Sequence, residues 1–148
     1  MVDLGSEELR SMVLDSARRR IGTGRSEDDD FSALGPDVSD RPIQWCGIGA
    51  LAVYHEAGLG LQVLWRISFG FSRHLRLTQH PEPADLVILP KREYYHEAII
   101  EELNQHSMTV IAANTGMPPG KWSRGSYTLP HPGALFFSIQ GWIDAVMA

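Results

Sequence analysis

The chain has a single cysteine, Cys46, at the start of the apolar run CGIGALAVYHEA, which is followed by Gly58. This run predicts a helix over residues 46–57, because glycine commonly terminates helices. The N–H groups and the dipole at a helix N-terminus stabilise a thiolate, which is the nucleophilic form of cysteine. Cys46 is therefore a candidate nucleophile. The alternative is a small buried hydrophobic residue, which is what many lone cysteines are.

A thiolate nucleophile needs a base, and His96 is the best placed of the six histidines. It opens the run HEAIIEEL (96–103), a predicted strand in which His96, Ala98 and Ile100 point to one face. We interpret this apolar face as the core face, which ends at an imidazole, and the neighbouring Glu97 as turned away from the site. The alternative is a histidine at a strand end that only forms local hydrogen bonds.

The next predicted strand, SMTVIAAN (107–114), follows a short polar connection that suits a hairpin. A turn centred on Gln105 places Asn114 opposite His96, close enough for the two side chains to touch. An amide oxygen beside an imidazole can hold one tautomer and direct the second nitrogen at a thiol. A slip of one residue would turn Asn114 to the other face. Asn114 can also be interpreted as a turn residue of NTGMPPG.

The pattern of the whole chain predicts helices first and strands later. The apolar residues of segment 6–21 recur at helical spacing and predict a helix. Ser6 is the expected N-cap, and the two acidic residues of the first turn lie where the helix dipole favours negative charge. Short apolar or alternating runs predict four strands, over residues 85–90, 96–103, 107–114 and 134–140. This order indicates an α+β fold with helices packed on one face of an antiparallel sheet. Residues 59–83 carry no clear pattern.

Length, composition and charge restrict the class of protein. The chain of 148 residues predicts a single domain over residues 1–148, and its 43% hydrophobic and 21% charged residues are typical of globular proteins. A net charge of −5 argues against nucleic acid as a partner. One cysteine excludes an internal disulfide, and no apolar run reaches the ~20 residues of a membrane span. The N-terminus does not resemble a signal peptide, so we expect synthesis in the cytoplasm.

Three segments, QWCGIGALAVYHEAGL, PADLVILPKREYYHEAII and TVIAANTG, resemble in this order the papain-like cysteine peptidases of bacterial cell walls. These are the NlpC-type and CHAP (cysteine, histidine-dependent amidohydrolase/peptidase) families. The resemblance extends from about residue 8 to residue 140. It implies a papain-like fold, in which a helix headed by the cysteine packs on an antiparallel sheet that carries the histidine. Cys46 then resembles the nucleophile, His96 the general base and Asn114 the orienting residue.

The resemblance implies hydrolysis of an amide bond of peptidoglycan, either within the stem peptide (endopeptidase) or at its link to the sugar (amidase). The thiolate attacks the carbonyl, the imidazole protonates the leaving amine, and water releases the acyl group. Gln44, Trp45 and Tyr95 are candidates for the oxyanion site or the substrate cleft. Trp45 before the nucleophile resembles CHAP members more closely than the NlpC type, where Asp is common. Gln44 can equally be an exposed loop residue.

No metal or other cofactor is expected. His74, His80 and His96 lack a compact zinc-ligand spacing, and the acidic run 28–30 lacks the alternation and the glycine of calcium loops. The expected partner is peptidoglycan or another peptide amide, reached in the cell wall or periplasm by a route such as that of a phage lysin or a delivered effector. An immunity or inhibitor protein is left open. The alternatives are a non-catalytic binding module of the same fold and an acyltransferase or deamidase that acts on proteins.

Overall fold

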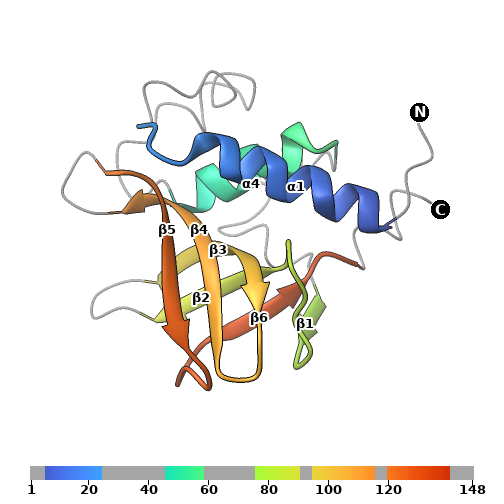
Figure 1. Ribbon diagram of the computed structural model, residues 1–148, viewed down its shortest axis with the longest axis vertical. Helices are drawn as coiled ribbons and strands as arrows, with labels where there is room; N and C mark the ends of the chain where they lie inside the picture. The colour runs from blue at the N-terminus through green and yellow to red at the C-terminus, as the bar shows by residue number, and fades with distance from the viewer. Residues whose placement is uncertain (1–5, 25–45, 59–75, 91–94, 116–119, 141–148) are drawn as a thin grey trace.

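The computed structural model describes residues 6–24, 46–58, 76–90, 95–115 and 120–140. Among these residues, two helices, α1 (Ser6–Arg20) and α4 (Cys46–Glu56), cover one side of an antiparallel sheet (Figure 1). The strands are β1 (Arg76–Thr78), β2 (Leu86–Pro90), β3 (Tyr95–Leu103), β4 (Ser107–Thr115), β5 (Lys121–Thr128) and β6 (Leu135–Ser138). In the described part of the chain their order in the sheet is β1-β6-β2-β3-β4-β5. The predicted α+β class with an antiparallel sheet is confirmed.

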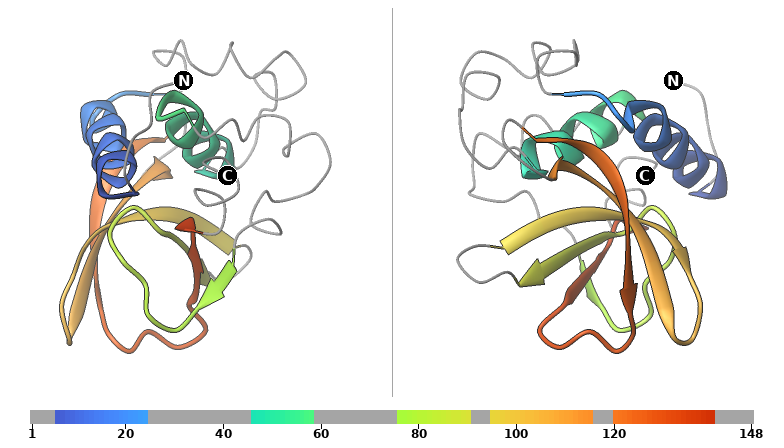
Figure 2. Two further views of the ribbon diagram at one scale, coloured as in Figure 1. Left: turned by 90° about the vertical axis from the view of Figure 1, so that its right-hand side faces the viewer. Right: turned by 60° about the vertical axis from the view of Figure 1, so that its left-hand side comes forward.

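The sheet is curled, and it buries apolar side chains on both faces (Figure 2). The helix-side cluster joins the two helices to the sheet and consists of Leu9, Val13, Ala17, Ala50, Ala52, Val53, Tyr54, Ala57, Ala84, Leu86, Ile99, Ile111, Ala113, Trp122 and Ile139. The inner cluster lies on the opposite face and consists of Val87, Leu89, Ala98, Ile100, Met108, Val110 and Ala112. Successive residues of a strand point to opposite faces, so β3 contributes alternately to the two clusters.

The helix α4 lies on β3 and β4 and approaches the sheet closely at its N-terminal half. Ala50, Val53 and Ala57 are buried at the spacing of one helix stripe. A Cβ atom at Gly49 would come within 2.6 Å of the Cβ of Ala113, so only glycine permits this contact. The helix is followed by Gly58 with a φ of +96°, which is the predicted terminator.

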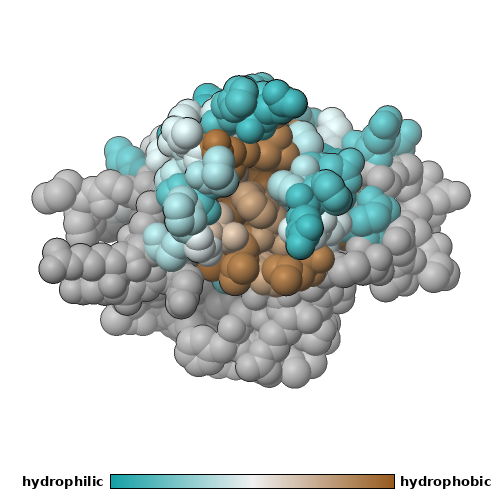
Figure 3. Space-filling view, turned by 90° about the horizontal axis from the view of Figure 1, so that it is seen from below, coloured by the Kyte–Doolittle hydropathy of each residue, from teal (hydrophilic) through white to brown (hydrophobic). Residues whose placement is uncertain are grey.

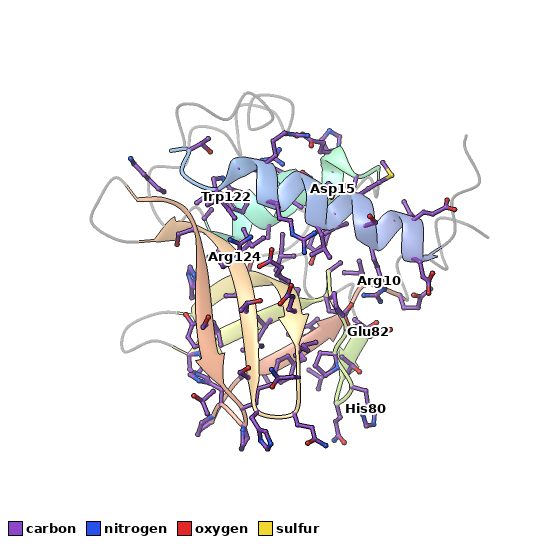
Figure 4. The ribbon with its side chains drawn as sticks, viewed as in Figure 1. Arg10, Asp15, His80, Glu82, Trp122 and Arg124 are labelled. Carbon is purple, nitrogen blue, oxygen red and sulfur yellow. The ribbon has the colours of Figure 1, made fainter. Side chains whose placement is uncertain are left out.

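Ion pairs attach α1 to the rest of the fold. Arg10 donates to the buried carboxylate of Asp85 at 2.9 Å, and Figure 4 shows Arg10 near Glu82 below the helix. Further along the helix, Arg18 contacts Glu101 of β3 at 2.7 Å, and Arg124 of β5 holds the other oxygen of Glu101 at 2.5 Å. The hydrogen bonds from Arg124 lower the pKa of Glu101 to about 2, and those from Arg18 act in the same direction. The carboxyl of Glu101 is therefore ionised, and both buried carboxyls, those of Asp85 and Glu101, are paired with arginines.

The inner cluster is partly open on the side away from the helices. Seen from this side, apolar side chains gather in the middle of the surface and hydrophilic ones surround them (Figure 3). The partly buried residues that pack against the inner cluster are Leu103, Tyr127, Leu129, Ala134 and Phe136. The curled sheet thus encloses a second core with no helix described on that face.

The predicted hairpin register of β3 and β4 is correct near the middle of the strands. Ile100 pairs with Val110, and Ile99 pairs with Ile111. Nearer the turn the register shifts by one residue between Ile100 and Glu102. Such a bulge adds one residue to a single strand and increases the local twist, which the sequence pattern did not indicate.

Two strands, β1 and β5, were not predicted. β5 has the sequence KWSRGSYT, and Trp122 is its only buried side chain. In the described sheet β5 is an edge strand and pairs with β4 alone. Most of its side chains are therefore exposed or half-buried, and the sequence lacks the apolar pattern of an inner strand. β1 has only three residues and lies at the opposite edge.

Candidate active site

The first candidate residue, Cys46, is the first residue of α4, as predicted. Its side chain lies outside the described residues. Position 46 precedes Ala50 by four residues and Val53 by seven, which is the spacing of the helix stripe that faces the sheet. One turn after Cys46, Gly49 contacts Ala113 near the end of β4. The N-terminal turn of α4 is therefore held at this end of β4.

The candidate base, His96, is the second residue of β3 and is buried with an exposed fraction of 5%. Its backbone pairs with Leu89 of β2. Strand alternation places it on the same face as Ala98 and Ile100, both of which belong to the inner cluster. His96 thus lies on the opposite face of β3 from the one that α4 covers.

The third candidate, Asn114, is the last residue but one of β4, and its side chain lies outside the described residues. Because β3 and β4 are joined by a turn at their other end, the start of β3 and the end of β4 share one end of the hairpin (Figure 1). The pairs between the two strands begin at Ile99 and Ile111. The predicted pair of Asn114 with His96 continues this register and stays a prediction.

At the start of β3, the side chain that points toward α4 is the carboxyl of Glu97 and not the imidazole of His96. Glu97 alternates with Ala98 and shares its face with Ile99, which belongs to the helix-side cluster. Its Oε2 atom is buried and has no hydrogen-bond partner among the described residues. Burial raises the pKa of Glu97 from 4.5 to about 7. The carboxyl therefore changes its charge near neutral pH.

Glu97 does lie on the face of β3 opposite His96, as strand alternation predicted, but the interpretation of the His96 face as the core face was incomplete for a physical reason. It assumed that a strand of this sheet has one buried face, as an antiparallel sheet with one solvated face does. The curl of the sheet buries both faces, so β3 has a histidine on one and a glutamate on the other. The only signal in the sequence was the spacing of Glu97 from Glu101, which places both carboxyls on one face before the bulge.

The remaining candidates are only partly described. Gln44 and Trp45 lie outside the described residues, as do His74 and the acidic run 28–30. Tyr95 is the first residue of β3 and its backbone pairs with Pro90, but its side chain is not described. Trp122 of β5 is buried beside Arg20 in the helix-side cluster.

The described residues contain neither a cluster of metal ligands nor a membrane-spanning helix. No group of three or more histidine, cysteine, aspartate or glutamate side chains that could hold a metal ion occurs among them. His80 is exposed, near the tip that follows β1 and far below the helices in Figure 4. Neither described helix is long and apolar enough to cross a membrane.

Comparisons of the chain with protein-family models, with curated proteins and with solved structures found no match. The functional interpretation therefore rests on the residues and on their placement in the fold. That placement brings together the N-terminal turn of α4, the end of β4 and the start of β3. A thiol, an amide, an imidazole and a carboxyl belong to these three segments.

Proposed function

We propose that this protein is a cysteine-dependent amide hydrolase that acts on peptidoglycan. Cys46 is the nucleophile, His96 the general base and Asn114 the residue that orients the imidazole. His96 lies on the face of β3 away from α4, so its role as base requires the imidazole to reach the thiol past the first residues of β3. The observation that supports the proposal most directly is that α4, which begins at Cys46, packs on β3 and β4, the strands that carry His96 and Asn114. This arrangement agrees with a papain-like fold, in which a helix headed by the nucleophile packs on an antiparallel sheet.

The position of Cys46 suits acyl transfer. The helix N-terminus favours the thiolate, which attacks the carbonyl carbon of the amide. The C–N bond then breaks, and the imidazolium of His96 gives its proton to the leaving amine. Water attacks the thioester and restores the thiol with release of a carboxylic acid. The backbone N–H of Cys46 is available to stabilise the oxyanion of both steps, because the first N–H groups of a helix have no partner within it.

The experiment that tests this function is mass spectrometry of purified peptidoglycan after incubation with the wild type and with Cys46→Ala. We expect new fragments from the wild type alone, and their masses identify the amide bond that is cleaved. His96→Gln should slow their release by at least about 100-fold, because the amide cannot accept and return the proton. Glu102→Gln, an exposed position on the same strand as His96, serves as the matched control and should leave the rate unchanged.

The result that would refute the cell-wall function is intact peptidoglycan with the wild type while a known lysin digests the same preparation. Equal fragment release by the wild type and by Cys46→Ala would refute the thiol mechanism instead. Transfer or release of groups from a protein substrate, with no effect on peptidoglycan, would favour an acyltransferase or deamidase of the same fold.

A further inference from the structure

The two edges of the described sheet differ in length. β1 has three residues, whereas β5 has eight, and β5 forms the left border of the sheet in Figure 1. An edge strand presents N–H and C=O groups that pair with no neighbouring strand, and proteins commonly keep such strands short or place proline in them. β5 has neither feature, because its sequence KWSRGSYT contains no proline. This edge is therefore suited to pairing with a further strand.

The alternation of the backbone shows which residues of β5 present these groups. Just after the strand, the N–H of Leu129 donates to the carbonyl of His106, which directly precedes β4, at 2.7 Å. In an antiparallel pair, successive residues direct their backbone groups alternately toward the partner strand and away from it. The odd-numbered residues of β5 therefore face β4. The outward residues include Arg124, Ser126 and Thr128, whose side chains are all exposed.

The first outward residue of β5, Trp122, shows that this edge can pair with another segment. Its N–H donates to the carbonyl of Thr23 at 2.9 Å, and its carbonyl accepts the N–H of Gly22 at 2.8 Å. Two residues opposite one, the first a glycine with a φ of +91°, form the arrangement of a β-bulge. The segment that follows α1 thus occupies one position of the edge. Among the described residues, none bonds to the outward backbone groups further along β5.

The charges of β5 indicate what kind of chain fits this edge. The strand carries two exposed cations, Lys121 and Arg124, and no acidic residue, although the whole chain has a net charge of −5. Arg124 binds Glu101 and still has 49% of its side chain exposed. Glu101 and the neighbouring Glu102 belong to β3, and β4 lies between β3 and β5. Cross-strand pairs of opposite charge stabilise a sheet and pairs of like charge destabilise it, so a strand with acidic side chains fits better than a second copy of β5.

We propose that the edge of β5 is a docking surface for an extended, acidic segment of another polypeptide, which joins the sheet as a further strand. The backbone N–H and C=O groups of this segment pair with those of Arg124, Ser126 and Thr128, and its carboxylates lie beside Arg124 and Lys121. The bonds between the two backbones supply the affinity, and the charges select the partner. None of these residues takes part in the proposed hydrolysis, so the surface is tested without a cell-wall substrate.

The first measurement is amide hydrogen exchange, followed by NMR, in the full chain without any partner. The amides of Ser123, Gly125 and Tyr127, which face β4, should be protected from exchange. The amides of the three outward residues should exchange at least about 10-fold faster, because they have no acceptor. Equal protection of both sets would mean that another part of the chain or a second copy already covers the edge, and it would overturn the proposal.

Binding is then measured with an acetylated and amidated peptide of the length of β5, in which glutamate alternates with valine, and with the same peptide carrying lysine in place of glutamate. We expect the acidic peptide, at concentrations up to about 1 mM, to shift the amide signals of β5 and to protect the outward amides. The lysine peptide should bind at least about 10-fold more weakly. An equal response to both peptides, or no response to either, would refute the proposal.

A variant of the edge itself shows where the peptide binds. Ser126→Pro removes an outward N–H without removing a bond to β4, so the fold should be retained. We expect binding of the acidic peptide to fall at least about 10-fold, because the edge loses a donor and the proline ring obstructs the incoming strand. Ser126→Ala retains the N–H and is the matched control, with binding unchanged. Unchanged binding in Ser126→Pro would place the contact elsewhere and overturn the proposal. If Ser126→Pro does not fold, hydrogen exchange in the wild type and the comparison of the two peptides still decide the outcome.

Discussion

Replacement of Glu97 by glutamine should change how the stability of the fold depends on pH. Burial raises the pKa of this carboxyl from 4.5 to about 7, so between these values the folded protein binds more protons than the unfolded chain. Stability therefore falls as the pH rises in this range. The contribution of the neutral carboxyl is complete below about pH 4.5 and is lost as the pH rises through about 7.

The size of the effect follows from the shift. A change from 4.5 to about 7 corresponds to about 3 kcal/mol in the free energy of unfolding, reached well above neutral pH. Glutamine has a similar shape and does not ionise. We expect the wild type to lose about 3 kcal/mol relative to Glu97→Gln between about pH 4.5 and about pH 8, with most of the loss between the unfolded pKa of 4.5 and the folded pKa of about 7.

The assay is urea-induced unfolding at a series of pH values, followed by tryptophan fluorescence, to which the buried Trp122 contributes. Other groups also titrate over this range, so the quantity of interest is the difference between the two proteins at each pH. Glu102→Gln is the matched control, since this exposed glutamate lies on the same strand. A difference between the wild type and Glu97→Gln that is constant with pH would refute the assignment of Glu97 as a buried, unpaired acid.

Two further predictions concern the attachment of the helices. Glu101→Gln should lower the free energy of unfolding by about 2 kcal/mol near neutral pH, because it weakens the bonds to Arg18 and Arg124, both of which are partly exposed. The pKa of Glu101 is lowered from 4.5 to about 2, so the stability that its ion pairs provide is complete above about pH 4.5 and is lost as the pH falls through about 2. Urea-induced unfolding at a series of low pH values measures this loss. Gly49→Ala should lower the free energy of unfolding by about 2 kcal/mol or more, because the added Cβ would lie 2.6 Å from the Cβ of Ala113. An unchanged midpoint of thermal unfolding would contradict this contact.

Much of the fold follows from local patterns in the sequence. The helix that begins at Cys46 and the inner strands β2, β3 and β4 lie within a residue or two of their predicted ranges, because buried segments bounded by glycine, proline and polar turns carry a strong signal. The pairing of Ile100 with Val110 was also predictable, because a short turn largely determines the register of a hairpin.

The edge strands and the bulge were not predictable from these patterns. β5 has a single buried side chain, Trp122, and its other positions are partly or fully exposed. The bulge near Glu101 leaves this carboxyl buried beside Arg18 and Arg124, which come from segments far apart in the sequence. Long-range ion pairs of this kind have no local signature in the chain.

Local patterns were enough to place the candidate site residues at the ends of elements: Cys46 at the start of a helix, His96 at the start of a strand, and Asn114 at the end of the next. The face of β3 that the helix covers, in contrast, depends on long-range packing and is known from the folded molecule alone. Alternation separates His96 from Glu97 but does not say which side receives α4, since that depends on the curl of the sheet and on the two cores that it creates. For this reason the buried carboxyl of Glu97 became visible only in the folded molecule.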